Sequence, residues 1–414
     1  MTIDDFPDRP ARPGSAIPPA TIENVAYLLA RAGITVRYNE VKKKVEITIP
    51  GHRGTAENFD NVTLTHIVSL CIKHGMAHGQ VGEYVNAIAD RHAYNPVADW
   101  IRATPWDGTD RLPDIYATVQ EQAGYPSALK EMLLHKWLRS AVAAAISPGF
   151  KGRGVLTFQG AQGIGKTSWV KALVNDKRLA DSVVKLDHHM DSSSKDSVLG
   201  AIGHWIVEMG EVDSAFRKDV ARLKGFITSD SDRLRRPYDR RDSEYPRRTL
   251  FVATVNDPAF LVDATGNSRW WTIAVDRLDF RHSIDMQQLF AQMATEVEAG
   301  GTWWLDEDEE ALLAVWNSRH TIISVVADAV RECLDLESDR HMAWATAGQV
   351  LKAAGIDRPT NAQARECGAI LRDLFGSPSR IRGISKWKVP YRAPIGDDLK
   401  DQGKGQRVEP EEVF

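Results

Sequence analysis

The feature that most constrains the fold is a glycine-rich turn, Gly160-Ala-Gln-Gly-Ile-Gly-Lys-Thr167. It matches the pattern G-x-x-x-x-G-K-[ST], in which glycines let several backbone N–H groups point at one anion. A β-rich run from Val155 to Phe158 precedes the turn, and an amphipathic stretch from Ser168 to Val174 follows it. This order of strand, turn and helix predicts a phosphate-binding loop in an α/β domain.

The residues of this loop have separate expected roles. The ammonium of Lys166 reaches the outer phosphates of a nucleotide, and the hydroxyl of Thr167 ligates Mg²⁺. ATP and Mg²⁺ are therefore the predicted cofactors. The expected nucleotide-binding residues are Gly160, Ala161, Gln162, Gly163, Ile164, Gly165, Lys166, Thr167 and Ser168.

An acidic group is expected at the end of a second buried strand, Trp205–Val207. Glu208 follows this strand directly, and Glu211 lies three residues further on. Ligands of parallel α/β sheets bind at the carboxyl ends of the strands, where an acid can hold Mg²⁺ or polarise water. We assign the metal to Glu208 and the water to Glu211, although the sequence leaves the reverse assignment open.

A third strand, Thr249–Val255, ends in Asn256, whose amide can reach the γ-phosphate or the attacking water. An asparagine at a strand end is also a common turn residue, so this role depends on the preceding loop and acidic strand. Arg269 follows within the same region. In ring ATPases, an arginine from one subunit completes the site of the next subunit. Arg269 is the candidate for this role, with a structural ion pair as the alternative.

The composition is that of an ordinary globular protein, with 43% hydrophobic residues and a net charge of −4 among 414 residues. No apolar run approaches the roughly 20 residues that span a membrane, and Met1–Pro19 lacks the apolar core of a signal peptide. Cys71, Cys333 and Cys367 lie far apart, in no metal-binding or disulfide spacing. A cytoplasmic location is therefore expected.

Periodicity divides the chain into six expected segments. An α+β domain combines helices near 20–32, 62–75 and 80–93 with a hairpin at 34–49, and a long helix is expected at 127–146. Near the C-terminus, helices at 325–337, 344–354 and 361–375 and a hairpin at 379–390 favour a winged helix. The segments are a disordered tail (1–19), the α+β domain (20–112), a helical connector (113–150), the ATPase domain (151–320), the winged-helix-like domain (321–392) and a charged tail (393–414).

Several phrases of the sequence resemble the virulence-associated protein E family and, more broadly, the superfamily 3 helicases of viruses and mobile elements. They are Asn95-Pro-Val, Trp106-Asp-Gly-Thr-Asp-Arg-Leu112, Pro148-Gly-Phe-Lys151, Trp205-Ile-Val-Glu-Met-Gly-Glu211, Asp232-Arg233, Arg236-Pro-Tyr238, Ala264-Thr-Gly-Asn267 and Arg269-Trp270. Ser268 departs from the family, which often has a second arginine there.

The resemblance implies an α/β P-loop NTPase core of the AAA+-like, superfamily 3 type, with the α+β and winged-helix-like domains on either side. It also implies a replication protein of a phage or other mobile element, working in a bacterial cytoplasm as a hexameric homo-oligomeric ring on single-stranded or forked DNA. Since no primase acids are evident, priming would fall to a separate primase or replisome protein.

In superfamily 3 rings, a hairpin between the acidic strand and the Asn strand projects into the pore, and by resemblance it spans 223–248. This segment is rich in arginine, which suits contact with DNA phosphates. The expected DNA-binding residues are Lys224, Arg235, Arg236, Tyr238, Arg240 and Arg241, the tyrosine by stacking on a base. An intersubunit or nucleotide-contacting loop is the alternative. For the whole chain, the alternatives to a helicase are a DNA-binding regulatory ATPase without unwinding activity and, less well supported, a small-molecule kinase.

Overall fold

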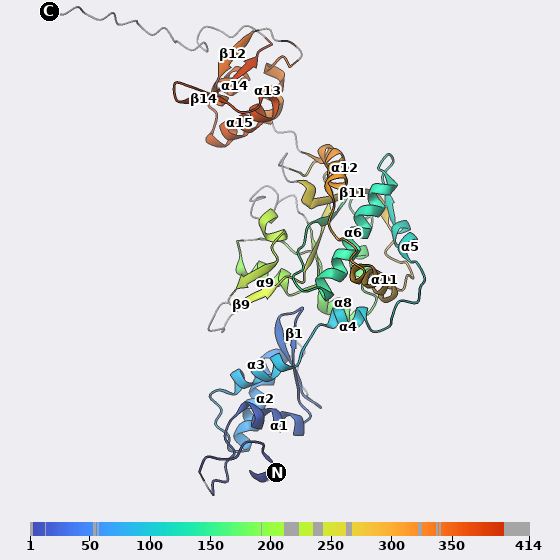
Figure 1. Ribbon diagram of the computed structural model, residues 1–414, viewed down its shortest axis with the longest axis vertical. Coiled ribbons are helices and arrows are strands. Elements are labelled where there is room, and N and C mark those ends of the chain that lie inside the picture. The colour runs from blue at the N-terminus through green and yellow to red at the C-terminus, as the bar shows by residue number, and fades with distance from the viewer. Residues whose placement is uncertain are drawn as a thin grey trace, which may run out of the picture. The chain divides into compact units, whose positions relative to one another are not determined.

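The computed structural model describes residues 3–12, 14–52, 55, 58–191, 193–210, 223–234, 243–261, 267–321, 325–336, 338 and 341–392. The chain divides into two compact units, residues 1–321 and residues 322–414 (Figure 1). Among the described residues, no helix is both long enough and apolar enough to cross a bilayer.

The first part of the larger unit contains the predicted helices and hairpin. Helix α1 begins after Thr21, whose side chain accepts a hydrogen bond from the Asn24 amide, as expected of an N-cap. Strands β1 and β2 pair antiparallel, and β3 adds parallel to β1. The elements are α1 (Ile22–Arg31), β1 (Thr35–Asn39), β2 (Lys44–Thr48), α2 (Phe59–Lys73), α3 (Val81–Arg91) and β3 (Ala93–Tyr94).

The N-terminal tail differs from its predicted disorder over the described residues 3–12 and 14–19. A short 3₁₀ helix, η1 (Ile3–Asp5), leads to Phe6, which is buried against the ring of Tyr27. The buried amide of Asn24 donates to the carbonyl oxygens of Asp8 and Pro19. One aromatic anchor and one asparagine thus hold a segment whose overall composition is polar.

A six-stranded sheet forms the centre of the larger unit, in the order β4-β11-β5-β10-β7-β6. Every neighbouring pair is parallel except β4 and β11, which are antiparallel. The strands are β4 (Val119–Glu121), β11 (Trp270–Leu278), β5 (Val155–Gln159), β10 (Leu250–Val255), β7 (Ile206–Met209) and β6 (Val184–Lys185). A mostly parallel sheet buried on both faces explains the nearly continuous apolar runs of its strands and confirms an α/β fold.

The two faces of the sheet belong to two different hydrophobic clusters, because alternate residues of a strand point to opposite sides. Leu156 and Ile206 lie in the larger cluster, which also contains residues of α6 and α7. Val155 and Val207 lie in the smaller cluster, with residues of α9. The helices are α4 (Pro96–Ile101), α5 (Leu112–Ala117), α6 (Ser127–Ile146), α7 (Lys166–Ala172), α8 (Lys177–Val183), α9 (Lys195–Ile202), α11 (Met286–Glu298) and α12 (Glu307–Asn317), and η3 (Asn267–Arg269) and η4 (Ser318–His320) are short 3₁₀ helices.

The segment 113–150, expected to be a helical connector, is instead built into the core of the sheet. Strand β4 forms the edge of the sheet beside β11. Helix α6 packs against α11 (Figure 1). Trp137 of α6 is fully buried, and its indole N–H donates to the carbonyl oxygen of Phe251 at 3.2 Å. The folding core therefore begins well before the phosphate-binding loop.

The smaller unit combines three helices with a three-stranded antiparallel sheet, in the order β12-β14-β13. The helix expected at 344–354 begins only at Ala347, because Thr346 caps it and the preceding residues pair with β14. The elements are α13 (Val325–Cys333), β12 (Met342–Ala345), α14 (Ala347–Ala353), α15 (Asn361–Phe375), β13 (Ser379–Ile381) and β14 (Ile384–Pro390). The tail expected at 393–414 lies outside the described residues.

Candidate functional site

The glycine-rich turn joins β5 to α7 and surrounds the ammonium of Lys166. This nitrogen donates to the carbonyl oxygens of Gly160 at 2.6 Å and Ala161 at 2.8 Å, and to Oδ1 of Asn256 at 2.8 Å. Burial lowers the pKa of Lys166, and the carboxylate of Glu208 opposes this shift. The loop thus holds one buried cation, with three acceptors for its three protons.

Two glycines of the loop are needed because β11 lies directly against it. A Cβ on Gly160 would lie 2.3 Å from the carbonyl oxygen of Val275, and one on Gly165 would lie 2.7 Å from that of Leu278. Gly165 also has φ +98°, a backbone conformation that L side chains rarely adopt. These positions explain the glycine pattern by close backbone approach, in addition to anion binding.

The carboxylate of Glu208 is fully buried and belongs to the next-to-last residue of β7. Its Oε1 accepts from the hydroxyls of Thr167 at 3.1 Å and Thr254 at 2.5 Å, and its Oε2 accepts from the Asp187 backbone amide at 2.7 Å. A buried carboxylate needs such donors, because water is not available to solvate it. The sequence interpretation missed the contributions of Thr254 and Asp187.

The strand order explains why these groups meet. Strand β10 lies between β5 and β7, so Asn256 at its tip stands between the phosphate-binding loop and the acidic strand. Side chains of Ile206 and Val252 point into the cluster that contains α7, and the two-residue period brings Glu208 and Thr254 to the same face. The structure therefore brings together four of the residues predicted for the site, Lys166, Thr167, Glu208 and Asn256.

The oxygen donors at this edge fit a magnesium ion. A hydroxyl and a carboxylate are hard ligands, and Mg²⁺ in nucleotide sites takes only one or two protein ligands beside phosphate oxygens and waters. The described residues contain no group of three histidine, cysteine or acidic side chains that could form an all-protein metal cage. Thr167 and Glu208 are thus suited to a metal that is shared with a nucleotide.

Arg269 lies at the amino-terminal ends of the strands, which we call the amino edge of the sheet, opposite the carboxyl edge that holds Lys166. It ends η3, and the next residue, Trp270, pairs with Val155 at the start of β5. Five residues of extended strand separate that level from Gly160, which corresponds to about 17 Å. Arg269 forms no ion pair with any described residue, and its buried Nε has no hydrogen-bond partner. It therefore cannot be part of the group of residues around Lys166.

Most of the predicted DNA-contacting residues lie outside the described residues. A hairpin of β8 (Ser231–Leu234) and β9 (Ser243–Pro246) is described at the expected place between β7 and β10. Lys224 is buried, with 7% of its surface exposed, which does not suit a lysine that tracks DNA phosphates. The predicted residues that lie outside are Arg235, Arg236, Tyr238, Arg240 and Arg241, together with Glu211 of the acidic strand.

Two arginines of the basic segment have structural partners. Arg247 is buried, forms a two-pronged ion pair with Asp232 in which both N···O distances are 2.7 Å, and lies over the ring of Phe226. Arg248 pairs with Glu40 at 2.7 Å. The Asp232–Arg247 pair joins β8 to the residue that follows β9 and so ties the two strands of the hairpin together.

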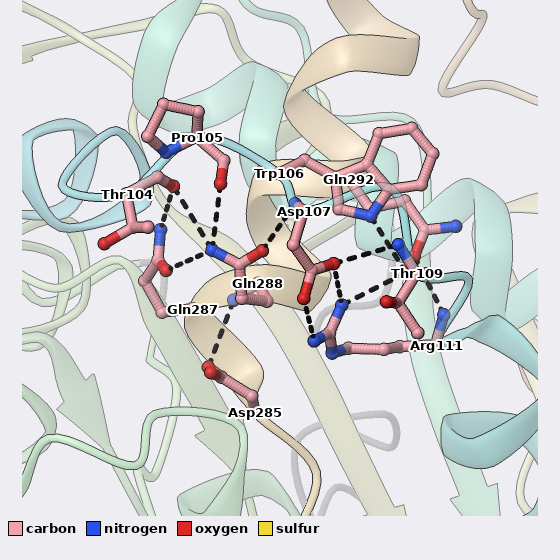
Figure 2. A network of polar contacts seen from close by, with 10 residues as sticks. All are labelled: Thr104, Pro105, Trp106, Asp107, Thr109, Arg111, Asp285, Gln287, Gln288 and Gln292. Atoms are coloured by element: carbon pink, nitrogen blue, oxygen red, sulfur yellow. Dashed lines mark hydrogen bonds and ion pairs between the residues drawn. The ribbon is translucent and has the colours of Figure 1, made fainter.

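The phrase Trp106–Leu112 forms a loop that is fastened to helix α11 (Figure 2). The amide of Gln288 donates to the Pro105 carbonyl and accepts from the Asp107 backbone N–H. Arg111 forms a two-pronged ion pair with Asp107, which holds the pKa of that carboxyl well below its usual range. Gln292 accepts from the Arg111 amide. This phrase thus shapes the scaffold and contributes nothing to the group around Lys166.

The comparison with protein families agrees with these observations. The model of the virulence-associated protein E-like domain matches residues 101–322. Two apo structures of the NrS-1 C-terminal region are distant likenesses. One is 15% identical with a TM-score of 0.35 and covers 86% of each chain; the other is 14% identical with a TM-score of 0.37 and covers 88% of this chain and 98% of that one. No curated protein matches. The matched domain takes up more than half of the sequence, and the chain belongs to the virulence-associated protein E-like family.

Proposed function

We propose that the chain is an ATP hydrolase that drives DNA unwinding in the replication of a phage or other mobile element. Family membership implies nucleotide binding and ATPase activity. The observation that carries the proposal is the meeting of Lys166, Thr167, Glu208 and Asn256 at one edge of the sheet. A buried cation, a hydroxyl, a carboxylate and an amide are the groups with which P-loop enzymes hydrolyse nucleoside triphosphates.

Each residue has a proposed task in this reaction. When bound, ATP and Mg²⁺ supply the scissile phosphoanhydride and the cation that neutralises it. Lys166 exchanges one of its present acceptors for a phosphate oxygen, and Thr167 with Glu208 holds the metal. Glu211 orients the attacking water. Asn256 keeps the Lys166 ammonium in place and reaches the outer phosphate or the water.

Arg269 is proposed to act in the site of a neighbouring subunit. Its distance of about 17 Å along the strands from its own loop argues against a role in cis. The lack of an ion pair within the described part of the chain leaves its charge available. This arrangement favours a closed ring, for which we propose six subunits, because each subunit then both receives and donates an arginine.

DNA contact is proposed for residues 235–242, which connect β8 to β9 in the sequence. Arg235, Arg236, Arg240 and Arg241 track phosphates there, and Tyr238 stacks on a base. The buried Asp232–Arg247 pair supports this role, since it holds together the two strands that flank this charged segment. Residues 321–392 are proposed to form the winged-helix-like module, which binds DNA or a partner protein such as a primase.

A strand-displacement assay on forked DNA tests the helicase proposal. We expect ATP-dependent displacement by the wild-type chain. ATP hydrolysis and DNA binding without displacement would favour the regulatory ATPase instead.

Replacing Arg240 and Arg241 with Ala tests the proposed hairpin contacts. The change should abolish displacement and weaken single-stranded DNA binding, with a salt slope lower by about 0.7 per lost contact, while basal ATP hydrolysis remains. Lys177 and Arg178, an exposed basic pair on α8, provide the matched control. Loss of hydrolysis with DNA binding intact would assign the hairpin arginines to the nucleotide site.

A further inference from the structure

The chain that follows β11 forms a turn, Asp279–His282, directly beside the phosphate-binding loop. The Leu278 amide donates to the Ile164 carbonyl at 3.0 Å, and the Asp279 amide donates to the Thr118 carbonyl at 2.8 Å. Because β11 runs parallel to β5, its carboxyl end lies at the same edge of the sheet as the loop. These bonds hold the turn in a fixed position relative to Gly165.

The turn carries an exposed aromatic ring. Phe280 has 38% of its surface exposed, and its Cδ1 lies 3.0 Å from the point where a Cβ on Gly165 would be. The guanidinium carbon of Arg281 lies 5.4 Å from the centre of this ring. An apolar ring in contact with the last glycine of the loop has no evident structural need to be exposed there.

The same turn holds unused hydrogen-bonding capacity. Both ring nitrogens of His282 are buried and have no hydrogen-bond partner among the described residues. Burial lowers the pKa of His282, so its ring is mainly neutral near pH 7. Unsatisfied buried polar groups are rare in folded proteins and call for a reason. A change in the position of the turn when a ligand binds would explain why these two nitrogens have no partner here.

We propose that the turn Asp279–His282 is the base subsite of the nucleotide site, with the ring of Phe280 stacked on the base. This inference rests on the proposed nucleotide site at Lys166. A single ribose separates the base of a nucleotide from its α-phosphate, so the base must lie close to the end of the phosphate loop, where Gly165 is. Stacking on an aromatic ring needs no particular hydrogen-bond pattern, because every base has a π-face.

Two ligands, measured by calorimetry on the full chain with Mg²⁺, test this inference. ATP reports on the phosphate and base subsites together, and tripolyphosphate reports on the phosphate subsite alone. Phe280→Ala should weaken ATP binding by roughly 5- to 150-fold, the loss typical of one base–aromatic stack, and leave tripolyphosphate binding unchanged. Phe280→Trp should retain ATP binding. Leu312→Ala is the matched control, since Leu312 is 45% exposed on α12, which contacts η3 at the opposite edge.

The outcomes separate this inference from the proposed function. If the wild-type chain binds both ligands but Phe280→Ala leaves ATP binding unchanged, or weakens both ligands equally, the base subsite lies elsewhere and the ATPase proposal stands. If the wild-type chain binds neither ATP nor tripolyphosphate, the proposed nucleotide site fails and the base subsite fails with it. Selective loss of ATP binding in Phe280→Ala, with retention in Phe280→Trp, supports the subsite.

Discussion

The charged side chains at the carboxyl and amino ends of the central strands differ in whether they have hydrogen-bond or ion-pair partners. At the carboxyl edge, Lys166 and Glu208 find hydrogen-bond partners within the chain itself. At the amino edge, Arg269 forms no ion pair with any described residue. The carboxyl edge thus has the groups of a nucleotide site, whereas the amino edge has a cation without an ion-pair partner among the described residues.

A second arginine near the amino edge shows that an unpaired charge is not a general property of this region. Arg247, which follows β9, is buried, forms an ion pair with both oxygens of Asp232 and covers an aromatic ring, and its Nη1 alone has no hydrogen-bond partner among the described residues. Arg269, just before β11, lacks such contacts among the described residues. We therefore assign Arg247 to the stability of the fold and propose that Arg269 contacts a neighbouring subunit. Four predictions test these differences.

The largest effect is expected at the carboxyl edge. Lys166→Ala should abolish ATP hydrolysis, because it removes the cation that neutralises the outer phosphates, and the fold should remain intact. Steady-state turnover and circular dichroism measure the two properties. Turnover near the wild-type value would overturn both the proposed function and the description of this edge.

At the amino edge, Arg269→Ala should reduce turnover by roughly 10³-fold or more while nucleotide binding stays normal. If the arginine acts in trans, mixing this variant with Lys166→Ala should restore part of the activity, because mixed rings contain some sites with both residues. Turnover of titrated mixtures measures this recovery. No recovery in mixtures shown to contain both variants would indicate a role within one subunit.

Arg247→Ala should act on stability instead of turnover. Leaving Asp232 buried without its partner is expected to lower the free energy of unfolding by about 3–5 kcal/mol, measured by urea denaturation. The neighbouring Arg248→Ala is the control, since its partly exposed pair with Glu40 should contribute about 1 kcal/mol or less. Equal losses in the two variants would remove the distinction between the buried pair and the surface pair.

The smallest effect is expected at Thr254, which orients Glu208 by a hydrogen bond. Thr254→Val keeps the shape of the strand residue but removes the hydroxyl, and should raise the Mg²⁺ concentration for half-maximal hydrolysis by about 10- to 100-fold. Thr254→Ser, which keeps the hydroxyl, should resemble the wild type. An unchanged magnesium dependence in the valine variant would mean that Thr254 does not position the metal ligand.

Local patterns were sufficient to predict the elements around the phosphate loop. The helix at 127–146 has the predicted bounds. Strand β5 ends directly before Gly160, and β10 ends directly before Asn256. These elements have strong signals, because buried parallel strands are continuously apolar and the loop has a specific glycine spacing.

Other features depend on contacts that no local pattern records. Asp187 serves Glu208 through its backbone amide, so the identity of its side chain gives no signal. Thr254 is an ordinary strand former, and only the order of the strands places it beside Glu208. The tail 1–19 was expected to be disordered because it is rich in Pro and Asp and has no apolar core, yet burial of one ring, Phe6, anchors its described residues.

The incorporation of β4 and α6 into the sheet has a practical consequence for recombinant expression of the ATPase domain. A fragment that begins at residue 151, the predicted start of that domain, lacks both elements. Its nine-residue strand β11 then becomes the edge of the sheet, and the hydrophobic cluster that the sheet shares with α6 loses the α6 side chains. Long, apolar edge strands pair with other chains and aggregate. A soluble fragment of this region should therefore begin before Asn95, so that α4 and α6 still cover the sheet.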